Sequence, residues 1–600
     1  MKGIAIGLSN NSKEILKRLK KTEFVKDIYI AGSSKDAGKV NELIQVQKPK
    51  KILLKKWSEI DLIIFIGSIA ASIRIINSFL TSKDQDPSVI VIDKKCSKIV
   101  PLIGLHHSNT QNIAFQIANL FGGEIIETNN SNDQSFLNLD AFGYQWGWKR
   151  SGKIKDWSKL VIKQAKNEEI FCKQLSGNSL WKTSESAEII NQINEKETEK
   201  PDSTFHVSIF KKHLTTWHPP VLWVGIGCER NTSKELIANS FNNFLESGNF
   251  SQQSIAGFAT IDIKKDEKGI LELSKEKNLP IKFFSKEDLS TIIVPNPSTV
   301  VQKEIGTPSV AEASCLLAAG EESKLLKEKR IFKNQSGAVT IAVAESKNQY
   351  NPTHGEIHII GSGPGDISFL TSNAKKALSR CTVWIGYKMY LDLIKPLKRN
   401  DQVLIESKLT EEKDRCSKAI KLAEEGIKVA LISSGESGFY GMAGLLLELL
   451  QKIKIEYRPY FEVHPGISSV QLAAAISGAP LMNDFCSISL SDKLTPWSLI
   501  EKRIAGALMG DFVIALFNPQ SIERNWQLKI VIDICLKSRL GNTPVLIARQ
   551  VGRENQSKKF FTLNTIPFKE IDMLSIIIIG NSQTTLVDEI FLTPRGYLKN

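Results

Sequence analysis

Short apolar runs alternate with amphipathic stretches along most of the chain. In the first part, apolar runs stand at residues 3–6, 28–31, 62–66 and 89–92, and a helical pattern follows at 110–121. Buried parallel strands are continuous apolar runs, whereas an amphipathic helix repeats its apolar positions every three to four residues. The alternation therefore predicts a multidomain α/β protein with largely parallel sheets.

Changes in composition predict where the domains end. Asn, Ser and Asp dominate residues 129–134, and residues 347–354 are polar and contain Pro352. New blocks open with strand patterns at 221–227 and 356–360. We expect α/β domains at 1–135, 221–345 and 355–600, a middle region at 136–220 that holds several tryptophans without clear periodicity, and a linker at 346–354.

The composition narrows the class of protein. A chain of 600 residues is too long for one hydrophobic core. The longest apolar runs, at 62–71 and 575–580, are too short to span a bilayer, and the first residues do not form a signal peptide. The eight cysteines include no C-x-x-C pair. We expect a cytoplasmic protein with reduced thiols, no membrane segment and no protein metal site.

The formal net charge of +14 has two interpretations. The lysines are spread among acidic and polar residues, which is typical of solvated helix faces. A cleft lined with cations would instead concentrate a substrate that carries many carboxylates. We find no nucleic-acid-binding module and no basic stripe with interleaved aromatic residues, so nucleic acid is not an expected partner.

Two small-residue loops each follow a strand pattern in the last block. Residues 361–366 read Gly-Ser-Gly-Pro-Gly-Asp, and residues 433–443 read Ser-Ser-Gly-Glu-Ser-Gly-Phe-Tyr-Gly-Met-Ala. A dinucleotide fingerprint requires glycine where Asp366 stands, and a P-loop requires a Gly-Lys-Ser/Thr ending. Pro364 removes a backbone N–H, so a tight turn explains the first loop by itself. Both loops lie where α/β proteins bind ligands.

Further motifs in this block carry a family resemblance. They are Ile-Ser-Leu-Ser-Asp at 488–492, Gly-Arg-Glu at 552–554 and Thr-Pro-Arg-Gly-Tyr at 593–597. With the two loops, they make residues 355–597 resemble the class III tetrapyrrole methyltransferases, and among these the precorrin-3B C(17)-methyltransferases and cobalt-factor III methyltransferases. The resemblance implies methylation with ring contraction in cobalamin synthesis. It also implies a homodimer and two lobes, at about 355–463 and 467–600, with S-adenosylmethionine between them.

The resemblance and the loops together define candidate site residues. Asp366 and Glu436 are candidates for orienting the substrate or transferring protons, although Asp366 equally suits a helix cap. His464 stands where the family has an apolar residue, so we assign it no catalytic role. The candidate cofactor-binding residues are Gly361, Gly363, Pro364, Gly365, Ser434, Gly435, Ser437, Gly438, Tyr440, Gly441, Met442 and Asn518.

The N-terminal part resembles the cobalt-precorrin-5A hydrolase family at both of its ends. The resemblance rests on residues 73–74, 83–89 and Asp93, and on the segments 223–232, 261–267, 283–285 and 308–313. It implies opening of a lactone and release of acetaldehyde. The family's Ser-Gly-His-x-Gly-Gly segment is represented by residues 104–109, where His106 aligns and the paired glycines are missing. His106 is thus the candidate for activating water, with a structural histidine as the alternative.

Two other functions stay open at this point. The same methyltransferase fold could act at another carbon of the ring, and the N-terminal half could be a tetrapyrrole-binding module without catalysis. Both alternatives retain a tetrapyrrole as the partner.

Overall fold

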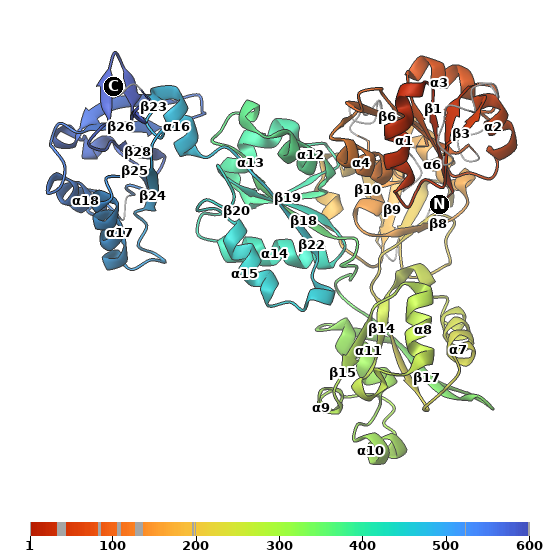
Figure 1. Ribbon diagram of the computed structural model, residues 1–600. Coiled ribbons are helices and arrows are strands. Elements are labelled where there is room, and N and C mark those ends of the chain that lie inside the picture. The colour runs from red at the N-terminus through yellow and green to blue at the C-terminus, as the bar shows by residue number, and fades with distance from the viewer. Residues whose placement is uncertain are drawn as a thin grey trace. The chain divides into compact units, whose positions relative to one another are not determined.

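The structure, a computed structural model, describes residues 2–32, 44–81, 86–104, 110–126, 136–194, 197, 200–521 and 524–597. Two compact units make up the chain (Figure 1). Unit 1 comprises Met1–Tyr144, Trp148–Leu175 and Ile189–His218, and unit 2 comprises Gln145–Gly147, Ser176–Glu188 and Pro219–Asn600. Both units contain sheets flanked by helices, which confirms the expected multidomain α/β class.

Unit 1 begins with a seven-stranded sheet in the order β3-β2-β1-β4-β5-β6-β7. Its pairs are parallel except that of β5 with β6. Apolar side chains on both faces of β1 and β4 pack into separate core clusters, as expected for a sheet covered by helices on both sides. The strands are β1 Gly3–Gly7, β2 Asp27–Ala31, β3 Gln45–Gln47, β4 Leu62–Ile66, β5 Ser88–Ile92, β6 Lys98–Ile103 and β7 Glu124–Ile125; the helices are α1 Lys13–Lys20, α2 Pro49–Lys56, α3 Ile69–Ile76 and α4 Thr110–Phe121.

A second sheet of unit 1 lies in the region for which the sequence predicts no regular pattern. Its order is β10-β9-β11-β12-β8, from strands of three to five residues that are too short for a periodic signal. Trp157 and Trp217 are buried and pack with ring centroids 5.6 Å apart, so aromatic burial stabilises this part. The elements are α5 Phe142–Gln145, β8 Lys149–Ser151, α6 Ile154–Ala165, β9 Ile170–Gln174, β10 Ile190–Gln192, β11 Thr204–Val207 and β12 Thr216–His218.

Unit 2 contains a five-stranded sheet in the order β15-β14-β13-β17-β16. β13, β14 and β15 are parallel, whereas β16 and β17 form an antiparallel hairpin beside them. The elements are β13 Leu222–Cys228, α7 Lys234–Ser247, β14 Ile255–Ile261, α8 Lys268–Lys277, β15 Ile281–Phe284, α9 Lys286–Ser290, α10 Thr299–Ile305, α11 Ala311–Ala319, β16 Lys324–Asn334 and β17 Gly337–Glu345.

The next sheet of unit 2 is entirely parallel and has the order β20-β19-β21-β18-β22. Figure 1 shows α12 and α13 on one side of it and α14 and α15 on the other. The elements are β18 Glu356–Gly361, α12 Ser372–Arg380, β19 Val383–Tyr387, α13 Lys388–Ile394, β20 Val403–Ser407, α14 Glu412–Glu424, β21 Lys428–Ser433, α15 Ala443–Gln451 and β22 Tyr460–His464. We call this part the first lobe.

The last part of unit 2, the second lobe, contains a five-stranded sheet in the order β24-β25-β28-β26-β27. β24 and β25 are parallel and the other pairs are antiparallel. A three-stranded sheet of β23, β30 and β29 completes it. The elements are α16 Ser469–Ser477, β23 Gly478–Ala479, β24 Phe485–Ser489, α17 Trp497–Met509, β25 Val513–Phe517, α18 Gln527–Leu536, β26 Pro544–Arg549, β27 Ser557–Thr562, β28 Ser575–Ile579, β29 Thr585–Val587 and β30 Ile590–Leu592.

Two short segments from the middle region belong to unit 2. Gln145 Nε2 donates to Asp401 Oδ2 at 2.8 Å, and Asn178 Nδ2 donates to Glu425 Oε2 at 2.6 Å. The buried Gln349 amide donates to the carbonyl oxygens of Trp146 and Glu425. These segments therefore satisfy polar groups of the first lobe and of the linker before it.

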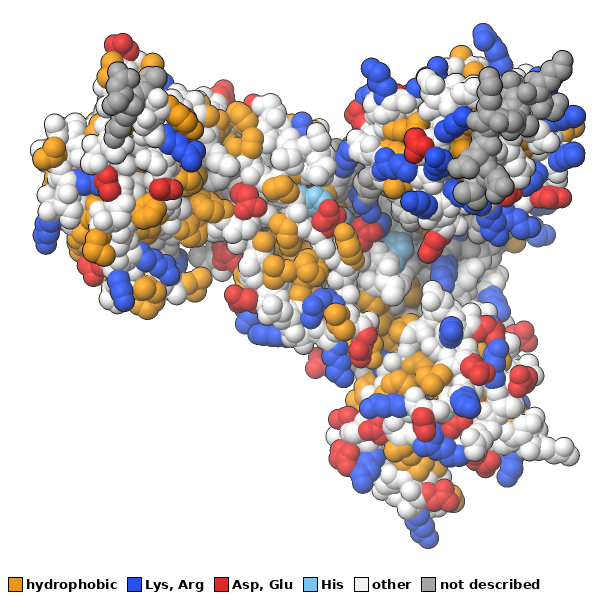
Figure 2. All heavy atoms as spheres, in the orientation of Figure 1, with side chains coloured by type: hydrophobic (Ala, Val, Ile, Leu, Met, Phe, Trp, Pro, Cys, Tyr) orange, Lys and Arg blue, Asp and Glu red, His pale blue; other side chains and the backbone are white. Residues whose placement is uncertain are grey.

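The basic side chains are spread over helix surfaces. Figure 2 shows Lys and Arg side chains over the part of unit 1 that carries α1 and α2, whose Arg18, Lys20, Lys50, Lys51 and Lys55 are exposed. Within the described ranges, no helix is both long and apolar enough to cross a membrane.

Candidate functional site

The candidate site lies at the carboxyl edge of the parallel sheet in the first lobe. β19 and β21 are neighbours, and the chain leaves β19 toward β20 on one side and leaves β21 toward β22 on the other. Strand connections that diverge in this way leave space for a ligand at the carboxyl edge of an α/β sheet. The two glycine loops predicted from the sequence follow β21 and its other neighbour, β18.

The two loops pair with each other beyond the ends of their strands. Ser362 N donates to Ser433 O at 2.8 Å, and Gly363 and Gly435 exchange two backbone hydrogen bonds of 3.1 and 2.9 Å. Both glycines have positive φ, at 74° and 63°, in the region that favours glycine. Their pairing fixes the first loop against the second.

A third loop, after β22, closes against the other two. A Cβ on Gly466 would lie 2.1 Å from Gly435 O and 2.6 Å from Gly361 O. A Cβ on Gly361 would lie 2.6 Å from Gly466 N. Three backbone segments therefore meet at distances that only glycine permits. We call Gly361, Gly435 and Gly466 the glycine junction.

Polar groups of the second loop are held close to this junction. Glu436 Oε2 accepts a hydrogen bond from Gly438 N at 2.7 Å, and Ser433 Oγ accepts one from Met442 N at 3.3 Å. Ser437 is fully buried, yet its Oγ has no hydrogen-bond partner among the described residues. A buried hydroxyl without a partner is costly, which is the pattern expected of a group that binds a ligand.

The second lobe reaches the same loop through aromatic contacts. Tyr440, at φ 57°, donates its hydroxyl to Ser487 O at 3.0 Å. The rings of Phe439 and Tyr440 each lie 5.2 Å from the ring of Phe517. Asn518, which follows Phe517, donates Nδ2 to Ser489 Oγ at 3.0 Å. The ends of β24 and β25 are thus joined to the second glycine loop.

Asp366 also connects the lobes, but through its backbone. Its N–H donates to Gly552 O at 2.6 Å, and a Cβ on Gly365 would lie 2.4 Å from the same oxygen. Its exposed carboxylate accepts a hydrogen bond from Ser368 N at 2.7 Å and caps the 3₁₀ helix Ile367–Phe369. Hydrogen bonds from the Ser368 side chain and backbone hold the pKa of the Asp366 carboxyl below its usual range. Asp366 thus caps the short 3₁₀ helix that follows it, whereas Thr371 caps α12.

A pocket adjoins this edge at the ends of β19 and β20. It has a volume of about 660 Å³, and its lining includes Met389 and the cationic side chains Lys388 and Lys408. Arg553 of the second lobe donates Nη1 to Met389 Sδ at 3.5 Å and Nε to Pro364 O at 3.3 Å. A neighbouring phenol, Tyr390, has its pKa raised by burial.

The structure brings most of the candidate residues together. The residues in the two paired glycine loops are Gly361, Gly363, Pro364, Gly365, Asp366, Ser434, Gly435, Glu436, Ser437, Gly438, Tyr440, Gly441 and Met442. Asn518 lies one residue beyond the Phe517 ring that contacts Tyr440. His106 and residues 105–109 lie outside the described residues, and only Gly104 of that segment is described.

Three residues of this site were not among the candidates. Gly466, Gly552 and Arg553 all belong to sequence motifs, but their positions against the first lobe are seen only in three dimensions. The signal that could have identified Gly466 is its Pro-Gly-Ile-Ser context, which directly follows β22.

Comparison with known proteins identifies the class. Residues 356–567 match the family model Tetrapyrrole (Corrin/Porphyrin) Methylases. Residues 51–132 match Cobalamin synthesis G N-terminal, and residues 222–344 match Cobalamin synthesis G C-terminus. The chain belongs to the tetrapyrrole methylase family.

Individual relatives make the comparison more specific. The chain is 44% identical over 241 residues to the "Probable cobalt-factor III C(17)-methyltransferase" of Salmonella typhimurium, covering 40% of this chain and 99% of that protein. It is also 44% identical to the "Cobalt-factor III methyltransferase" of Priestia megaterium, of which it covers 45%. The crystal structure of the methyltransferase CobJ is 33% identical, with a TM-score of 0.39, over 40% of this chain and 100% of that one.

The glycine junction gives a first testable prediction. Gly466→Ala should destabilise the protein by about 1–3 kcal/mol, because the new methyl group meets backbone oxygens that cannot move independently. Thermal unfolding would show a lower midpoint. Gly444→Ala is the matched control, since a Cβ there meets nothing within 4 Å. Equal unfolding midpoints for the two variants would contradict a close-packed junction.

Proposed function

We propose that residues 355–600 form an S-adenosylmethionine-dependent methyltransferase. It would methylate C(17) of precorrin-3B or cobalt-factor III and contract the ring, in cobalamin biosynthesis. The observation that carries the proposal is the glycine junction at the carboxyl edge of a parallel sheet, within the part of the chain that matches the tetrapyrrole methylases.

The residues at this edge fit the proposed cofactor. The unpartnered Ser437 hydroxyl offers a hydrogen bond to a polar group, and the half-buried Gly435 and the exposed Gly438 carry no side chain that would prevent close approach. We propose that S-adenosylmethionine is held by the loops that contain Gly361, Gly363, Pro364, Gly365, Ser434, Gly435, Ser437, Gly438, Tyr440, Gly441 and Met442, with Asn518 from the second lobe.

The chemistry requires positioning more than reactive side chains. When bound, the cofactor supplies a methyl group already activated by its sulfonium. The protein contributes by aligning the ring carbon and excluding water. Asp366 and Glu436 are the proposed proton-transfer groups. The lowered pKa of Asp366 keeps its carboxylate ionised, so it does not donate a proton at neutral pH and is a weaker base than an ordinary aspartate.

The pocket beside Met389 is the proposed place for part of the substrate. Lys388 and Lys408 give it two cationic groups, which favours a ring that carries several carboxylates. Lys388 Nζ lies 3.1 Å from Asp392 Oδ1 and 3.2 Å from Glu406 Oε1. A substrate carboxylate would therefore compete with these two carboxylates for the Lys388 ammonium group.

The decisive test is product identification. The purified chain should convert cobalt-factor III or precorrin-3B, with S-adenosylmethionine, into a ring-contracted product with one added methyl group at C(17), as identified by mass spectrometry and NMR. Methylation at another carbon would favour the alternative in which the same fold acts elsewhere on the ring. No methylation of either substrate would refute the proposal.

Cofactor binding can be tested at Ser437. Ser437→Ala should weaken S-adenosylmethionine binding about fivefold in calorimetry, because a hydrogen bond contributes about 1 kcal/mol net. Ser254→Ala is the matched control, since Ser254 is also fully buried with its Oγ unpartnered among the described residues, but it lies beside β14. An unchanged dissociation constant for Ser437→Ala would remove the hydroxyl from the proposed site.

A second activity is proposed for the N-terminal part. Both Cobalamin synthesis G models match it, which favours a cobalt-precorrin-5A hydrolase-like region at 1–135 and 221–345, with His106 as the group that activates water. Incubation of the full chain with cobalt-precorrin-5A should release acetaldehyde, and His106→Ala should abolish the release. No acetaldehyde from the unmodified chain would leave a non-catalytic tetrapyrrole-binding module.

The remaining expectations complete the proposal. We propose that the middle region at 136–220 and the linker at 346–354 connect the hydrolase-like part to methyltransferase lobes at 355–463 and 467–600. The protein would act in the cytoplasm as a homodimer, through the methyltransferase part, and without nucleic acid.

A further inference from the structure

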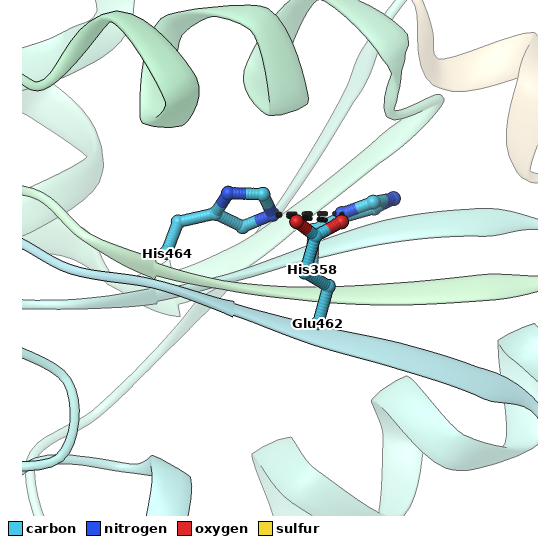
Figure 3. Close-up of side chains that lie close together, drawn as sticks. All are labelled: His358, Glu462 and His464. Atoms are coloured by element: carbon cyan, nitrogen blue, oxygen red, sulfur yellow. Dashed lines mark hydrogen bonds and ion pairs between the residues drawn. The ribbon is translucent and has the colours of Figure 1, made fainter. Parts of the chain in front are cut away.

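A buried group of metal-binding side chains lies in the first lobe, on β18 and the edge strand β22. His358 pairs in register with Glu462, and Ile360 pairs with His464, so the three polar side chains share one face of the sheet. His358 and His464 are 1% and 5% exposed. Figure 3 shows the Glu462 carboxylate next to the nitrogen atoms through which the two imidazole rings face each other.

The distances between the donor atoms fit a metal ion. His358 Nδ1 lies 2.9 Å from His464 Nε2, and each of these nitrogens lies 3.9 Å from Glu462 Oε2. The point equidistant from the three atoms is about 2.1 Å from each, which matches typical Zn–N and Zn–O bond lengths. In the part of the chain that the structure describes, no other three His, Cys, Asp or Glu side chains offer ligand atoms within 4.8 Å of one another.

We propose that His358, Glu462 and His464 bind a divalent transition-metal ion of the zinc type. Two imidazole nitrogens and one carboxylate oxygen suit Zn²⁺ or Co²⁺, whereas Mg²⁺ and Ca²⁺ prefer oxygen ligands. Three protein ligands leave a fourth position for water, and the Glu462 side chain is 46% exposed on that side. The ion would reside in the protein, distinct from any cobalt that a substrate carries.

The surroundings of His358 support this assignment. Its Nε2 lies 2.8 Å from Glu356 Oε2, and Glu356 also forms ion pairs with Arg380 at 2.9 Å and with Lys428 at 2.7 Å. The Glu356 carboxylate, fixed by these two cations, accepts a hydrogen bond from the Nε2–H group of His358. The Nδ1 lone pair of the same ring is then free to face the metal. Histidines that bind metals commonly donate their other ring N–H to a carboxylate in this way.

The position of the site suggests what the ion does. β22 is the edge strand of its sheet and is paired only with β18, and His464 is its last residue. Pro465 and Gly466 follow at once, and Gly466 belongs to the glycine junction. An ion shared by His358 and His464 would fasten the end of this edge strand to the neighbouring strand β18. The proposal does not rest on the methyltransferase assignment.

Metal content and affinity test the proposal on the full chain. The protein is first dialysed against chelator and then titrated with Zn²⁺ alone. By elemental analysis, the unmodified protein should bind about one equivalent of Zn²⁺ more than the double variant Glu462→Gln/His464→Leu. Glu462→Gln alone, which changes one ligand, should weaken Zn²⁺ binding at least about tenfold in calorimetry. Glu356→Gln leaves all three ligands in place and should weaken Zn²⁺ binding about 10–100-fold. Glu456→Gln, an exposed carboxylate between α15 and β22, is the matched control and should have no effect.

A spectroscopic measurement separates this site from the eight cysteines. Co²⁺ bound to the site should show visible absorption without a sulfur-to-cobalt charge-transfer band, and Glu462→Gln should reduce that absorption. Because Glu462 is exposed, we expect Glu462→Gln to fold like the unmodified protein. Circular dichroism would check that both proteins are folded. Equal Zn²⁺ binding by the unmodified protein and the variants, or none by either, would overturn the proposal and leave a hydrogen-bonded histidine pair.

Discussion

The close approach of three backbone segments at Gly361, Gly435 and Gly466 is the constraint on which the rest of the site depends. Each segment follows a different parallel strand, and a side chain at Gly361 or Gly466 would collide with backbone atoms of the other segments. The approach sets the register of the two small-residue loops. The second of these loops carries both the unpartnered Ser437 hydroxyl and the Tyr440 ring.

The second lobe meets this edge by two different kinds of contact. Backbone atoms meet at Asp366 and Gly552, while aromatic rings meet at Phe439, Tyr440 and Phe517. The backbone hydrogen bond requires a particular direction between donor and acceptor, whereas the aromatic contacts bury apolar area without a strict geometry. Together they hold the lobes in contact while leaving the pocket beside Met389 open.

The sequence predicts the α/β class and the position of both glycine loops because these depend on local patterns. The strand pattern at 356–360 and the helical pattern at 110–121 correspond to β18 and α4 within one residue. The sheet around Trp157 and Trp217 was missed because its strands are short and its order depends on contacts distant in sequence. The proximity of His358 to His464 was missed for a related reason, since residues so far apart in sequence leave no spacing motif.

The division of the chain into two units limits how the protein can be separated into folded fragments. Gln145–Gly147 and Ser176–Glu188 lie upstream in sequence but belong to the unit that contains both lobes. No single cut in the polypeptide can therefore release an intact copy of either unit. Removal of everything before residue 355 would expose Asp401 and Glu425, whose amide partners come from those segments. Recombination at the linker would therefore not exchange complete modules.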